Sequence, residues 1–147
     1  MDNMKNVIIS IQGTQKRDGE ESDAVELVTD GLFCHEGGIS KFSYMESELT
    51  GMEGTKTSFD IGSQGFITMS REGTVSSQMV FEEGKKHNFI YETPFGSAIM
   101  GVNTRKLVAD FNEHGGNLEI DYLVDYQQSL VGHNRFKIKV REQKEEV

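Results

Sequence analysis

The sequence predicts an all-β protein built as one closed, antiparallel, up-and-down β-barrel. Apolar and polar residues alternate with period two, most clearly in Phe136-Lys137-Ile138-Lys139-Val140, which puts one set of side chains on a buried face and the other in water. The chain holds 16 glycines and one proline, a balance that suits many tight turns. Turn signals recur at short spacing, and sequential hairpins favour a closed barrel because closure removes exposed strand edges.

The alternating runs and the turns between them predict ten strands in order. We expect them near residues 4–14, 24–36, 39–48, 54–62, 65–71, 74–82, 86–93, 97–112, 117–127 and 133–141. Most of the connections contain glycine, as in Glu36-Gly37-Gly38 and His114-Gly115-Gly116. Thr93-Pro94-Phe95-Gly96 fits a type I turn, because proline presets φ at the second position. The pattern leaves almost no room for helix.

The last two strands carry opposite charges on their outward positions. If Tyr126 pairs with Asn134, each acidic residue of one strand faces a basic residue of the other. The outer pairs would then be Asp125 with Arg135, Asp121 with Lys139 and Glu119 with Arg141. Such cross-strand pairing explains the basic stripe of the last strand without a bound partner.

Length and charge exclude several classes of protein. The 147 residues fit a single domain, residues 1–147. With 24 acidic and 15 basic residues the formal net charge is −9, which argues against a nucleic-acid binder and against binding to an anionic membrane surface. The apolar run Val7 to Ile11 is too short for a signal peptide, and no stretch is long enough to span a bilayer. We therefore expect a cytoplasmic protein.

No motif assigns an enzymatic or metal-dependent activity. The single cysteine, Cys34, excludes an intramolecular disulfide and a cysteine-based zinc site, and a buried structural role is expected for it. The four histidines share no ligand spacing, and no glycine-rich nucleotide-binding motif appears. We expect neither a metal nor a cofactor and name no catalytic residue.

Strand parity places several polar side chains on the inner, apolar face of the barrel. These candidate ligand-binding residues are Tyr44, Glu46, Thr57, Arg71, Met79, Tyr91, Tyr122 and Asn134. Glu46 is the one clear anion among them and Arg71 the one clear cation, so we expect the two to share a hydrogen-bonded network, directly or through Tyr91 or Tyr122. Such a network either fixes the packing of a filled barrel or orients the polar head of a ligand.

Several short motifs, taken together, resemble those of one family. They are Lys41 to Glu46, Gly51 to Thr57, Arg71 with Gly73, Met79-Val80-Phe81 with Gly84, Tyr91 to Gly96, Thr104, Tyr122 and Ser129 to Asn134. The chain resembles the bacterial YwiB-like domain of unknown function over about its whole length. The resemblance implies a calycin-type (lipocalin-like) β-barrel and no established activity. Other calycins often hold small hydrophobic ligands, which is an analogy of fold.

Three functions are compatible with these observations. The first is a non-enzymatic binding module for a small amphipathic molecule in the barrel interior. The second is an enzyme in which Glu46 acts as acid or base and Arg71 holds an anionic substrate group. The third is a solid barrel that binds another protein. A cavity lined by methionine and aromatic rings favours the first, an incompletely paired Glu46 the second, and a filled interior the third.

Overall fold

The computed structural model describes residues 4–17 and 23–143, and in that part of the chain the ten expected strands are all found. They are β1 (Lys5–Arg17), β2 (Asp23–Glu36), β3 (Ile39–Met45), β4 (Lys56–Ile61), β5 (Phe66–Glu72), β6 (Ser77–Glu82), β7 (Lys86–Thr93), β8 (Gly96–Asn112), β9 (Gly115–Tyr126) and β10 (Ser129–Glu142). One short 3-10 helix, η1 (Glu48–Thr50), lies between β3 and β4. No helix in the described ranges is long and apolar enough to cross a membrane.

All ten strands belong to one antiparallel sheet in the order β6-β5-β4-β3-β2-β1-β10-β9-β8-β7. Strands that are neighbours in the sheet are also consecutive in the chain, with one exception. This exception is the pairing of the first strand, β1, with the last, β10. The two outermost strands of this order, β6 and β7, meet at a seam where the ladder is reduced to one bridge between Ser76 and Glu92. The predicted all-β up-and-down barrel is therefore confirmed, and it is nearly closed.

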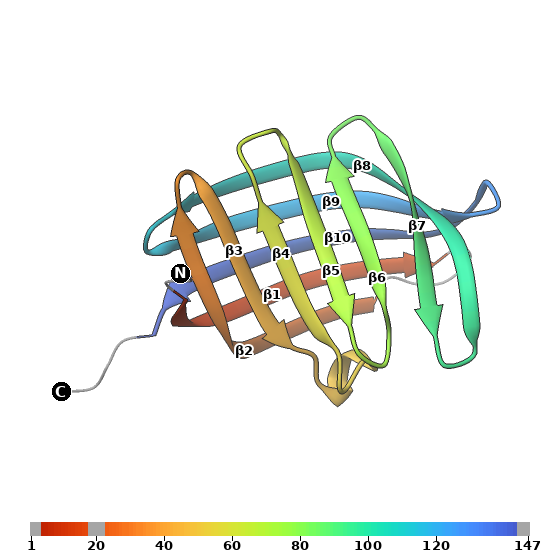
Figure 1. Cartoon of the computed structure of the whole chain (residues 1–147). Helices are drawn as coiled ribbons and strands as arrows, with labels where there is room; N and C mark the ends of the chain where they lie inside the picture. Colours follow the sequence, from red (N-terminus) through yellow and green to blue (C-terminus); the bar gives the residue numbers. More distant parts are fainter. Residues whose placement is uncertain (1–3, 18–22, 144–147) are drawn as a thin grey trace.

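The barrel is flattened into two layers (Figure 1). The short strands β3 to β7 lie in front of the longer strands β8, β9, β10 and β1 and cross them at a steep angle. Strands β2 and β8 bend at the corners and connect the layers. A bulge between Thr104 and Lys106 interrupts the register of β8, as expected where a long strand must turn.

Phenylalanine side chains close one end of the barrel. Phe42 stacks on Phe59 with 4.7 Å between ring centroids, and Phe111 lies 6.0 Å from Phe42 and 6.2 Å from Phe33. Phe33 and Phe42 are fully buried, so this end has no entrance through the cluster. Four of the polar residues singled out by strand parity, Tyr44, Glu46, Thr57 and Arg71, lie near the β3–β4 and β5–β6 connections.

The predicted register of the last hairpin is wrong by four residues. Asn134 pairs with Tyr122 rather than with Tyr126, and β10 begins at Ser129 rather than near residue 133. The reason is a two-residue turn at Gln127 and Gln128, whose φ angles are 50° and 68°. Such turns normally show Asn-Gly or Asp-Gly, so the sequence gives no signal for this one. Because the error is an even number, every side chain keeps its predicted face.

The outer charge pairs change with the register. Asp121 bonds Arg135 (3.1 Å) and His133 (2.6 Å), while Lys139 lies opposite Asn117. Cross-strand pairing therefore accounts for only part of the basic stripe. A second correction concerns Cys34, which is half-buried and not a fully buried core residue. Its neighbour on the inner face is Phe33, and alternation turns the thiol outward.

Candidate functional site

The loop between β3 and β4 holds Glu46 at the polar end of the barrel. The Glu46 N–H donates to the Thr55 carbonyl at 2.8 Å. Gly54 has φ 88°, which favours glycine, and the loop packs so closely on Gly73 that a Cβ there would lie 2.2 Å from the Gly54 carbonyl oxygen. The Thr55 hydroxyl also accepts from the Val75 N–H. The Gly51-to-Thr55 motif thus builds a fixed loop next to Glu46.

Threonine hydroxyls satisfy the Glu46 carboxylate. Thr57 donates to Oε1 at 3.1 Å, and Thr50 donates to Oε2 at 3.0 Å. Glu46 is 6% exposed and Thr57 is fully buried. A buried carboxylate that accepts a hydrogen bond at each oxygen is stabilised in its buried position.

Arg71 lies beside this group without taking part in its hydrogen bonds. On β5 it is the cross-strand partner of Thr57 on one side and of Ser77 on the other. Its Nε is buried and has no hydrogen-bond partner in the described residues, and the same holds for the Ser77 hydroxyl. Among residues 4–17 and 23–143, no ion pair includes Arg71. A direct hydrogen bond between Arg71 and Glu46, one form of the expected network, is therefore not found there.

The charged groups shift the pKa values of two buried tyrosines, Tyr44 and Tyr122. Burial raises the pKa of Tyr44 well above its usual range; the Glu46 carboxylate raises it further, and the Arg71 guanidinium partly offsets the shift. Burial also raises the pKa of Tyr122, against the opposing effects of Arg71 and of a hydrogen bond with Asn134. Both hydroxyls therefore stay protonated at neutral pH and present O–H donors.

A cavity of about 40 Å³ lies among these side chains. Of the eight predicted site residues it is lined by Tyr44, Arg71 and Tyr122. Glu46 and Thr57 adjoin it through the contacts described above. Met79 is buried in the core, Tyr91 is half-buried against it, and Asn134 contacts the hydroxyl of Tyr122. The remaining lining is apolar and comprises Ile11, Phe59, Met69, Phe81, Ile120, Phe136 and Ile138.

The site contains one feature that was not predicted, the buried hydroxyl of Thr104. This hydroxyl also has no hydrogen-bond partner in the described part of the chain. Thr104 lies on β8 and is the cross-strand partner of Tyr122 on β9. The bulge follows Thr104, which shares strand parity with Met100 and the buried Val102, so alternation was the signal that could have marked it as inward-facing.

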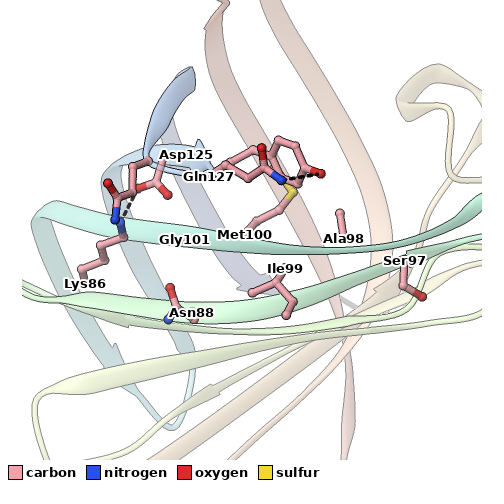
Figure 2. A pocket seen from close by; sticks show the side chains of 11 residues that line it. Lys86, Asn88, Ser97, Ala98, Ile99, Met100, Gly101, Asp125 and Gln127 are labelled. Carbon is pink, nitrogen blue, oxygen red and sulfur yellow. Dashed lines mark hydrogen bonds and ion pairs between the residues drawn. The ribbon is translucent and has the colours of Figure 1, made fainter.

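A much larger depression lies on the surface at the β7–β8 and β9–β10 ends. Figure 2 shows its lining, and its volume is about 730 Å³. Its charged groups pair with each other, since Lys86 Nζ lies 2.8 Å from Asp125 Oδ2. A Cβ at Gly101 would clash with both of these side chains, so the pair lies directly over the Gly101 backbone. Of the three unpaired buried atoms found in the described residues, Arg71 Nε belongs to the lining of the small interior cavity, and none belongs to the lining of this depression.

Comparisons with known proteins agree on fold and family. The family described as a domain of unknown function (DUF1934) matches residues 9–138. The solved structure of the YwiB protein from Bacillus subtilis aligns with a TM-score of 0.83 at 20% sequence identity, covering 98% of this chain and 96% of that one. At that identity the likeness shows the fold. No functionally curated protein matches the chain.

Proposed function

Since the chain belongs to the DUF1934 family, whose description carries no activity, we propose from the site alone that the protein is a binding module for a small amphipathic molecule. The polar head of the ligand would enter the cavity at Arg71, and its apolar part would lie along half-buried apolar side chains that pack against the core. The observation that carries this proposal is the buried, unpartnered Arg71 Nε at a cavity otherwise lined by aromatic and aliphatic side chains and Met69.

The cavity volume sets how much of the ligand can be enclosed. About 40 Å³ is little more than the 30 Å³ or so that one water occupies in the liquid, so only a head group fits. Half-buried apolar residues continue from the cavity along the inner face of the long strands. Among them are Leu27, Met100, Val124 and Phe136. They offer an apolar surface to the rest of the ligand, as binding sites commonly do.

Native mass spectrometry of gently purified protein tests the proposal directly. We expect a co-purified small molecule, or saturable binding of a fluorescent lipid-like probe to the stripped protein. A protein that carries no adduct and binds no such probe would contradict the proposal.

The same cavity volume favours a second candidate, a filled barrel that binds another protein. In that case substitutions at the cavity change stability alone, and binding depends on exposed residues such as Ile90 and Ile99. The enzymatic alternative receives less support, because both oxygens of Glu46 already accept hydrogen bonds from threonines. A cytoplasmic location remains part of the proposal.

A further inference from the structure

The three unpartnered buried polar atoms belong to a residue that lines the cavity and to cross-strand partners of lining residues. Arg71 and Ser77 are cross-strand partners on β5 and β6, and Thr104 is the cross-strand partner of Tyr122. Arg71 and Tyr122 both line the cavity, so the orphan atoms belong to its lining or lie one residue away. Buried polar atoms without partners are rare in native proteins and point to a missing group.

The chemistry of these atoms indicates that the missing group is an acceptor. Arg71 Nε–H can only donate, and the hydroxyls of Ser77 and Thr104 can donate as well. Tyr122 keeps its proton because burial raises its pKa, so it does not present a negative phenolate. A water could satisfy the hydrogen bonds, but an anionic acceptor adds Coulombic attraction to the guanidinium charge, which a neutral water does not.

From this arrangement we infer that the cavity receives the carboxylate of an amphipathic monocarboxylate, a conclusion that rests on the proposed function and specifies its ligand class. Because the Glu46 carboxylate lies nearby, a head group with one negative charge is favoured over one with two. A planar carboxylate suits the fork of an arginine and the small volume, whereas a phosphate is bulkier and brings up to two charges. The nearby Glu46 disfavours that second charge. A cationic head is disfavoured by Arg71 and finds Glu46 already bonded by Thr50 and Thr57.

Four probes that share a ten-carbon chain separate the head groups. Decanoate, 1-decanol, decylamine and decyl phosphate are titrated into the full-length protein by calorimetry at pH 7.5. We expect decanoate to bind roughly tenfold tighter than 1-decanol, since charge-assisted hydrogen bonds are about twice as strong as neutral ones. Decyl phosphate and decylamine should bind more weakly than decanoate. Equal binding of decanoate and 1-decanol, or tightest binding of decylamine or decyl phosphate, overturns the carboxylate inference and leaves the binding module intact.

A matched pair of variants assigns the preference to Arg71. Arg71→Gln should bind decanoate and 1-decanol equally, while Arg105→Gln, which removes an exposed arginine, should keep the wild-type preference. If Arg71→Gln does not fold, the wild-type protein decides: the decanoate preference should vanish as the pH falls through the carboxyl pKa, near 4–5, while arginine stays charged. A preference that persists below that pH refutes the inference. Failure of all four probes to bind refutes the proposed function itself.

Discussion

Two buried threonines should respond to the same substitution with opposite changes in stability. Thr57 and Thr104 are both fully buried on the inner face, but only Thr57 uses its hydroxyl, which donates to Glu46 Oε1 at 3.1 Å. Valine keeps the shape and the β-branching of threonine, so each Thr→Val change isolates the hydroxyl. The comparison therefore tests the hydrogen-bond assignment at the centre of the site.

The expected magnitudes follow from the two environments. A hydrogen bond to a charged group contributes about 1.5–3 kcal/mol, and an added buried methyl group returns about 0.8 kcal/mol, so Thr57→Val should lower the free energy of unfolding by roughly 1–2 kcal/mol. Thr104→Val loses no hydrogen bond and should raise it by about 1 kcal/mol. Urea unfolding at constant m-value measures both changes, which correspond to shifts of about 2–4 °C in Tm per kcal/mol. A Thr104→Val variant as destabilised as Thr57→Val would refute the assignment.

Three further predictions concern the turn, the pH dependence and the charged pair. Gln128→Gly should stabilise the protein by about 1 kcal/mol in urea unfolding, because glycine tolerates the positive φ, and no gain would argue against the observed turn. The native pKa values of Tyr44 and Tyr122 are raised, so their contribution to stability is complete below about pH 10 and is lost as the pH rises further; a urea midpoint that does not fall between pH 9 and pH 11 would contradict this. Arg71→Met should cost less than about 1 kcal/mol, since threonines hold Glu46, and a loss of 3 kcal/mol or more would show that Arg71 is the counter-ion Glu46 needs.

The sequence predicted the barrel well because one face of nearly every strand is buried. Period-two alternation then fixes which side chains point inward, and glycine turns fix where strands end. The register of the last hairpin was predicted wrongly because its turn is made by Gln127 and Gln128. Their φ angles are positive, but glutamine gives no compositional signal for such a turn. Tertiary packing, not local preference, selects that turn. The error moved pairings by four residues and left Phe136 on the inner face, where it lines the cavity.

Strand alternation predicted that residues of the candidate site face the barrel interior, but not how they are bonded. Alternation identified Tyr44, Arg71 and Tyr122 as inward-facing, and all three line the cavity. Which donors satisfy Glu46 depends on distances across a loop and two strands, and these are not encoded in any short pattern. Opposite charge suggested Arg71, whereas the nearer threonine hydroxyls take both carboxylate oxygens.

The two ends of the barrel differ because threonines, and not Arg71, donate to the Glu46 carboxylate. At one end Phe33, Phe42 and Phe111 stack over the core, and the buried Ser40 hydroxyl beside them shares a hydrogen bond with His35 Nδ1 at 2.7 Å. At the other end the hydrogen bonds to Glu46 come from uncharged threonines, and the Arg71 side chain has no hydrogen bond or ion pair in the described residues. Had the two charges paired directly, this end would be as self-contained as the phenylalanine end. Because Thr50 and Thr57 donate to the Glu46 carboxylate, the Arg71 guanidinium is available to a ligand. Arg71 also lines the cavity in which that ligand would bind.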